Sequence, residues 1–161
     1  MKKLFCVIAA ATILVLIGAK EQTGGVKEPQ CAAIEKAVLQ THEKIVKAAE
    51  AMDLETFYDF ILDHDKGVII NDGRLFATRQ EALESSKKAF EGIRHIEYQF
   101  DKKLVHVLSP EIAVVATSGT TFVETDSGQS FQRPFAHTSV FVLQDGQWKI
   151  THGHHSVPDL R

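Results

Sequence analysis

The chain has 161 residues, with 18 Lys and Arg against 21 Asp and Glu, and a net charge of −3 at pH 7. It contains no run of basic residues and no interleaving of basic and aromatic residues, so we expect no nucleic-acid partner. A Walker loop, a dinucleotide fingerprint and a Gly-x-Ser-x-Gly motif are also missing from the sequence, so we expect neither a nucleotide cofactor nor a serine nucleophile. The length suits one domain with a substantial core.

The first 25 residues differ in composition from the rest. Two lysines near the start precede an uncharged, mostly aliphatic run, Leu4–Ala19, and polar residues follow as far as Gly25. This order predicts a secretory signal peptide over residues 1–25, a mature start between Lys20 and Val26, and export to the periplasm or the medium. A retained anchor is the alternative, but a bilayer span needs roughly 20 apolar residues, so we expect no stable membrane insertion after signal removal.

The two cysteines predict neither a lipid anchor nor a disulfide. Cys6 lies inside the apolar run, and the residues before Cys31 do not form a lipoprotein signal. Once the signal has gone, Cys31 is the single cysteine, so no intrachain disulfide can form. The mature domain must therefore be stabilised by packing.

Helical patterns occupy the first part of the mature chain. Apolar residues recur at helical spacing from Pro29 to Met52, and Asp53 can cap a second, shorter helix with an aromatic face that includes Phe57 and Tyr58.

A hairpin and a third helix are expected next. Strands at 68–70 and 74–76 are joined by Asn71-Asp72-Gly73, residues that tolerate the positive φ of a tight turn. A capping box at Thr78–Glu81 then opens a helix that ends near Gly92.

The remainder of the chain predicts strands. Ile96, Tyr98 and Phe100 alternate with polar residues, the pattern of a strand with one buried face. Further strands are expected at 104–108, 112–123, 131–143 and 147–156. We therefore predict an α+β fold over residues 26–161, a cone-like roll in which about three N-terminal helices pack on a curved, mainly antiparallel sheet with a pocket.

The last predicted strand contains three histidines within a stretch of four residues. Regular alternation places His152, His154 and Ser156 on the same face as Trp148, which marks that face as covered, and directs His155 away. The histidines could supply a metal site or an acid-base group, or could simply form the wall of a pocket.

A metal site would use His152 and His154, about 7 Å apart along the strand, with His137 or His106 as a third ligand. Nothing in the sequence determines that third ligand, so we expect no metal.

Acid-base chemistry needs only one histidine with a pKa near 6.5 in a dry cavity. We predict catalytic roles for His154, as the proton-transfer group, Tyr98, as a hydroxyl donor, and His137, as an orienting group. Asp59 and Asp63 are alternative carboxylate bases, although acids near helix ends are commonly solvated.

The remaining pocket residues are expected on the concave face and on the second helix, with Arg133 as an anion clamp. They are Phe57, Tyr58, Arg133, Phe135, Trp148, His152 and Ser156.

The hairpin Asn71-Asp72-Gly73-Arg74 and the ending Asp145-Gly146-x-Trp148-Lys149-Ile150-x-His152-x-His154-x-Ser156 resemble the SnoaL-like branch of the nuclear transport factor two-like superfamily. Ketosteroid isomerase and the association domain of the calmodulin-dependent kinase are similar to it. The resemblance, over about 32–158, implies a cone-shaped fold and a cavity bordered by His154 and Ser156. It also implies a homodimer through the outer sheet face, which here carries Val114, Ala116, Val140 and Val142. The catalytic triad of the superfamily's isomerases does not map onto this chain.

Folds of this type host enzymes and catalytically silent modules. Our leading interpretation is an exported SnoaL-like domain with an enclosed pocket for a small, largely apolar molecule and isomerase- or lyase-like proton transfer centred on His154. The alternative is a non-catalytic dimeric module for ligand binding or assembly.

Overall fold

The structure is a computed structural model of the chain, and it describes residues 26–63 and 69–158. The predicted signal peptide lies outside the described residues. Of the helices within these two ranges, none is long and apolar enough to cross a membrane.

Three helices form as the sequence patterns predict. They are α1 (Glu28–Glu50), α2 (Leu54–Asp59) and α3 (Arg79–Phe90). The carboxylate of Asp53 caps α2 by accepting a hydrogen bond from the amide of Thr56 at 3.1 Å. The hydroxyl of Thr78 caps α3 in the same way, through the amide of Glu81 at 3.2 Å.

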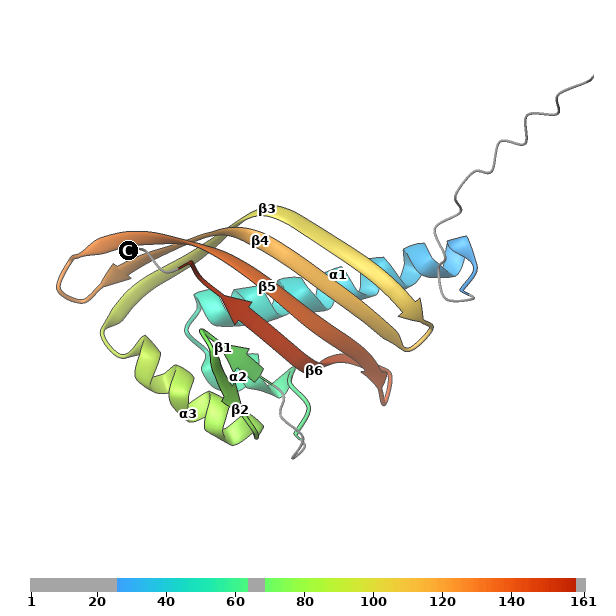
Figure 1. Ribbon diagram of the computed structural model, residues 1–161, viewed down its shortest axis with the longest axis horizontal. Helices are drawn as coiled ribbons and strands as arrows, with labels where there is room; N and C mark the ends of the chain where they lie inside the picture. The colour runs from blue at the N-terminus through green and yellow to red at the C-terminus, as the bar shows by residue number, and fades with distance from the viewer. Residues whose placement is uncertain (1–25, 64–68, 159–161) are drawn as a thin grey trace, which may run out of the picture.

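Six strands form one sheet in the order β2-β1-β6-β5-β4-β3 (Figure 1). They are β1 (Ile69–Asn71), β2 (Arg74–Phe76), β3 (Ile93–Ser109), β4 (Ile112–Thr125), β5 (Ser130–Gln144) and β6 (Gln147–Ser156). All neighbours are antiparallel except β1 and β6, which pair in parallel. Asp72 and Gly73, both with positive φ, make the predicted tight turn between β1 and β2. The predicted α+β class is confirmed.

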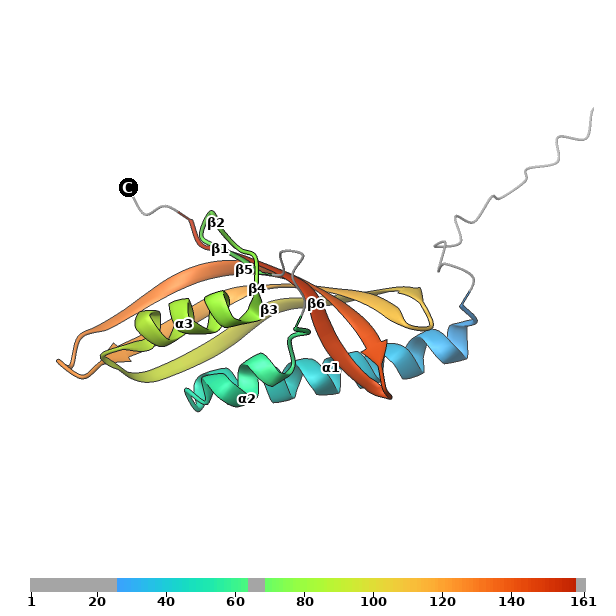
Figure 2. The ribbon, with the colours of Figure 1, turned by 90° about the horizontal axis from the view of Figure 1, so that it is seen from below.

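The three helices lie on one face of the long, curved strands (Figure 2). The hydrophobic core forms between the N-terminal part of α1 and one end of the sheet, where Val38, Val115 and Phe141 are fully buried. Under the C-terminal part of α1, together with α2 and α3, the concave face is hollow instead. One end of the cone is packed and the other holds a cavity.

Two irregularities of register in the sheet bear on the cavity. The two segments predicted around Ile96–Asp101 and Leu104–Leu108 are a single strand, β3, whose register against β4 shifts between Phe100 and Lys102. Opposite this shift is Gly119, where an added Cβ would overlap the backbone carbonyl of Gln99. A glycine is therefore required for the close approach of β3 and β4 at the bend.

The second irregularity lies between β5 and β6. Val140 pairs with His152, but the next residue, Phe141, pairs with Ile150. Thr151 is thus an extra residue in β6, and a bulge of this kind reverses the alternation of the residues that follow it.

Substitution of Gly119 by valine should destabilise the protein by about 1–3 kcal/mol, because the side chain forces β3 and β4 apart. The free energy of unfolding is measured by urea denaturation. Ser118→Val, at the adjacent position on the outer face, is the matched control and should change stability by less than about 0.5 kcal/mol. Equal unfolding midpoints for the two variants would contradict the requirement for glycine.

Candidate functional site

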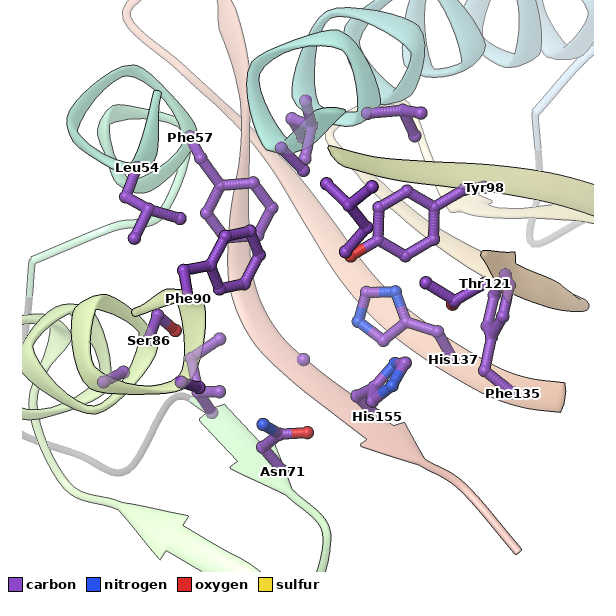
Figure 3. A pocket seen from close by; sticks show the side chains of 18 of the residues that line it. Leu54, Phe57, Asn71, Ser86, Phe90, Tyr98, Thr121, Phe135, His137 and His155 are labelled. Atoms are coloured by element: carbon purple, nitrogen blue, oxygen red, sulfur yellow. The ribbon is translucent and has the colours of Figure 1, made fainter. Parts of the chain in front are cut away.

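A cavity of about 370 Å³ lies between the concave face of the sheet and the helices (Figure 3). Aliphatic and aromatic side chains make up most of its wall. Among the described residues that line it, Asp72 and Arg133 are the two that carry a formal charge at neutral pH. Such a cavity favours a small ligand with little charge.

Aromatic rings form the sheet side of the cavity. Tyr98 and Phe100 project inward from β3 and Phe135 from β5, and the ring centroid of Phe135 lies 5.8 Å from that of Tyr98 and 5.6 Å from that of Phe100. The imidazole of His155, from β6, stacks on Phe135, with the ring centroids 5.7 Å apart. These four rings are the aromatic wall of the cavity. Phe57 from α2 and Phe90 from α3 face it from the helical side (Figure 3).

Two histidines lie side by side in the cavity. His137 on β5 and His155 on β6 are directly paired across the strands, and their ring centroids are 5.8 Å apart. The Nε2 atom of His137 lies 3.3 Å from the hydroxyl oxygen of Ser139. Gly153 lies beside this ring, and an added Cβ there would be in ordinary van der Waals contact with Nε2 of His137, at 3.5 Å.

Burial keeps the imidazoles of the cavity uncharged. It lowers the pKa of His137 from 6.5 to about 3, with a smaller contribution from the neighbouring His155. Burial, together with the charge of Lys103, lowers the pKa of His42 on α1 to about 4. The pKa of His155 is lowered chiefly by burial, and the carboxylate of Asp72 opposes that shift.

The two tyrosines of the cavity are protonated hydroxyl donors. Burial, assisted by the charge of Glu50, raises the pKa of Tyr98 to about 12. Burial also raises the pKa of Tyr58, whose hydroxyl lies 2.7 Å from that of Ser86. Glu50 holds β3 in place as well, because its carboxylate accepts a hydrogen bond from the amide of Tyr98 at 3.0 Å.

The predicted orientation of the C-terminal histidines is wrong. Because Thr151 is an extra residue, His152, His154 and Ser156 are not part of the cavity lining, and His155 takes the inward position. His154 and Ser156 are exposed to solvent.

Trp148 lies before the bulge and is buried in the core, so it too is outside the cavity lining. Gly153 was the available signal of a break in the alternation, since a glycine within a strand pattern often marks a bulge.

The structure brings the other predicted site residues together in the lining. They are Phe57, Tyr58, Tyr98, Arg133, Phe135 and His137. Asp59 and Asp63 lie elsewhere, as exposed carboxylates paired with Arg79 at 3.7 and 3.6 Å.

The histidines considered as metal ligands are not brought together. His137 faces the cavity, whereas His152 and His106 pair with outward-facing positions of β5 and β4 and are separated by about 14 Å, three strand spacings. Within the part of the chain that the structure describes, no group of three or more His, Cys, Asp or Glu residues could hold a metal ion.

Sequence patterns did not identify three further polar groups of the cavity. Nδ1 of His42, Oδ1 of Asn71 and Oγ1 of Thr117 are buried and have no hydrogen-bond partner among the described residues. In the sequence, His42 and Thr117 occupy the apolar faces of a helix and a strand, where a polar residue is commonly only a packing residue.

A family model for the SnoaL-like domain matches residues 38–159, most of the chain. The chain belongs to the SnoaL-like domain family. A comparison of this SnoaL-like domain with curated proteins gives no match.

Solved structures share its fold. A candidate dehydratase of the NTF2-like family from Streptomyces avermitilis has a TM-score of 0.71 at 19% identity, covering 80% of this chain and 99% of its own. A candidate scytalone dehydratase from Novosphingobium aromaticivorans has a TM-score of 0.73 at 11% identity, covering 83% and 89%. The association domain of CaMKII from C. elegans has a TM-score of 0.62 at 19% identity, covering 81% and 99%. At these identities the likeness establishes the NTF2-like cone fold of the SnoaL-like domain.

The neutral histidines predict how the stability of this SnoaL-like domain depends on pH. His137 and His42 have lower pKa values folded than unfolded, so the unfolded chain takes up protons first as the pH falls below about 6.5. The free energy of unfolding should therefore decrease from pH 7 towards pH 4, and His137→Asn should reduce that dependence. Urea denaturation at several pH values measures the slope. In parallel NMR titrations, ring signals of His137 that shift between pH 6 and 7 would contradict the neutral, buried imidazole.

Proposed function

We propose that the cavity binds a small, uncharged, largely apolar molecule and catalyses proton transfer on it, in a reaction of the isomerase or lyase type. The observation that carries this proposal is the combination of uncharged acid-base groups with an apolar wall. His155, His137 and the hydroxyl of Tyr98 extend into one cavity from three strands (Figure 3). Neutral imidazoles and phenols can transfer or donate protons without the cost of a buried charge.

His155, rather than the predicted His154, is the proposed proton-transfer group. A general base works best when its pKa lies near the ambient pH, and a pKa of about 3 makes His137 a weak base. His155 is better placed because the carboxylate of Asp72 raises its pKa against the effect of burial. The same carboxylate would stabilise the imidazolium that forms when His155 accepts a proton.

The hydroxyl of Tyr98 has a complementary role. With its pKa raised to about 12, it remains protonated and can donate a hydrogen bond to an oxygen on which negative charge develops. In an elimination, His155 would take the proton from the carbon next to a carbonyl. It would then return that proton to the departing hydroxyl, which leaves as water. An isomerisation would use the same first step and return the proton to another carbon.

The comparisons support this type of reaction without identifying a substrate. Two structures of the same fold are described as candidate dehydratases, and elimination of water requires the proton transfers outlined above. Their sequence identities of 19% and 11% leave the substrate of this chain open to experiment.

Substitution of His155 by glutamine should slow proton transfer by about a hundredfold or more, because it removes the base while leaving a polar side chain of similar size. The measurement is exchange of hydrogen for deuterium next to the carbonyl of small ring ketones in D₂O, followed by NMR. Dehydration of 3-hydroxycyclohexanone to cyclohexenone, followed by ultraviolet absorbance, provides a second readout.

His154→Gln is the matched control, since His154 is the adjacent histidine on the other face of β6, and this variant should retain the wild-type rate. If the wild-type protein is no faster than His155→Gln with every ketone, or if His154→Gln is the slower variant, the proposed role of His155 is wrong.

The alternative class, a non-catalytic dimeric module, is supported by the outer face of the sheet. Val114, Ala116, Val140 and Val142 lie on adjacent outward positions of β4 and β5, with the exposed Leu104 of β3 beside them. The similar CaMKII structure is an association domain. We propose that the mature protein is exported and that this outer face joins two copies, whether or not the cavity is catalytic.

Native mass spectrometry of protein recovered from the exported fraction tests both points. The expected mass is twice that of a chain beginning between Lys20 and Val26. Val140→Glu should give monomers, because it places a charge within the apolar outer face. Leu75→Glu, at an exposed apolar residue of β2, should leave the dimer intact. An uncleaved chain would contradict export, and monomeric wild-type protein would contradict the dimer.

A further inference from the structure

The inward-facing polar residues of the sheet form one line across the strands. Asn71 pairs with His155, His155 with His137, and His137 with Thr117, so four neighbouring strands contribute one polar side chain each. Directly opposite residues on a sheet have their Cβ atoms about 5 Å apart. Thr117 therefore lies next to His137 on the strand beyond the two histidines, in line with them.

His42 reaches the Thr117 end of this line from α1. Its ring packs edge-on against Phe100, with the ring centroids 5.4 Å apart. The ammonium of Lys103 lies over the same Phe100 ring, 4.1 Å from its centroid. Lys103 is the strand partner of Thr117. Lys103 is thus a neighbour of both His42 and Thr117, and its charge helps to keep His42 neutral. His42 also lies close enough to His137, the other strand partner of Thr117, to lower its pKa. We call His42, Thr117 and His137 the Thr117 subsite.

Two polar atoms of this subsite have no hydrogen-bond partner in the part of the chain that the structure describes. His42 and Thr117 each have an exposed fraction of only 5%, and neither Nδ1 of His42 nor Oγ1 of Thr117 has a hydrogen-bond partner among the described residues. Buried hydroxyl and imidazole groups in folded proteins almost always have one. Both residues line the cavity. The two atoms themselves are buried, so a ligand in the cavity bonds to them once either side chain turns towards it.

We infer that the Thr117 subsite binds an uncharged hydroxyl or carbonyl oxygen of a ring-containing ligand. This inference rests on the proposed function and specifies the class of molecule that the cavity accepts. We expect a neutral oxygen, since His42, Thr117 and His137 are uncharged and the ammonium of Lys103 belongs to an exposed side chain outside the described lining. The hydroxyl of Thr117 and the imidazole of His42 can each either donate or accept, so both an alcohol and a carbonyl can be bound.

The rest of the ligand lies against the aromatic wall. Phe100 and Phe135 adjoin the subsite on the sheet, and Phe57 and Phe90 face them across the cavity. A cavity of about 150 Å³ accommodates a single benzene ring, so a volume of about 370 Å³ admits a ligand of two fused rings.

Two naphthalenes of nearly equal shape test the subsite. 2-Naphthol carries the hydroxyl, and 2-methylnaphthalene carries a methyl group in its place. The ratio of their dissociation constants is measured at neutral pH by ligand fluorescence in the full-length mature protein. Comparing this ratio between variants cancels the different hydrophobicity of the two probes.

Thr117→Val removes the hydroxyl without changing the shape of the side chain and should shift the ratio about tenfold in favour of 2-methylnaphthalene. This is the effect of a hydrogen bond of about 1.4 kcal/mol. His42→Phe, which keeps the ring against Phe100, should shift the ratio in the same direction. The matched control is Thr121→Val, the same substitution in the cavity lining outside the subsite, and its ratio should stay within about twofold of wild type.

Each outcome has a defined meaning. A shift in both subsite variants but not in Thr121→Val supports the inference. If both probes still bind Thr117→Val and His42→Phe and the ratios are unchanged, the inference is wrong. The proposed function would still stand, and water rather than the ligand would bond to the polar atoms. If neither probe binds the wild-type protein, the cavity does not accept such rings, and the inference and the proposed binding function both fail.

Discussion

The extra residue at Thr151 determines which side chains of the last strand reach the cavity. Before it, Trp148 and Ile150 point into the core; after it, Gly153 and His155 point into the cavity, while His152 and His154 lie on the outer face of the sheet. Without the bulge, regular alternation would place His154 on the concave face and remove His155 from its position beside His137. The contacts of His155 with Phe135 and His137, and its electrostatic interaction with Asp72, all depend on this single shift in register.

Burial then controls the chemistry of the groups that the sheet brings together. His42 and His137 are held uncharged because the surroundings solvate an imidazolium poorly, and Tyr98 remains protonated for the corresponding reason. His155 differs from them because it adjoins the one carboxylate of the described lining. A single cavity therefore contains protonated hydroxyl groups, weakly basic imidazoles and one more basic imidazole, and this spread in proton affinity is what acid-base catalysis uses.

Local sequence signals predicted the elements and much of the cavity wall. The caps at Asp53 and Thr78, the Asp72-Gly73 turn and the alternation around Tyr98 each act over a few residues, so they can be read from a short stretch. The same alternation failed at His154 because a bulge depends on the pairing of two strands, and no short-range pattern measures that pairing.

Contacts between residues far apart in the sequence could not be predicted either. Asp72 lies beside His155 only because β1 pairs in parallel with a strand some 80 residues later in the chain. His42 and Thr117 line the same cavity because the ring of His42 on α1 packs against Phe100 on the sheet, and each alone fits an ordinary packing position. The resemblance to the SnoaL-like branch predicted the fold correctly. Its His-x-Ser ending, however, predicted cavity positions for His154 and Ser156, which lie outside the cavity lining here.

The position of β6 in the sheet has a consequence for the order of folding. This strand follows all the other described strands in the sequence, yet it lies between β1 and β5 and also exchanges backbone hydrogen bonds with Phe60 and Leu62 through Ile150. The helical half of the protein is therefore joined to the strand meander through β6. Such long-range pairing is slow to form. Until it forms, the cavity lacks His155 and part of its wall, so a chain without β6 would lose the proposed proton-transfer group as well as the link between its two halves.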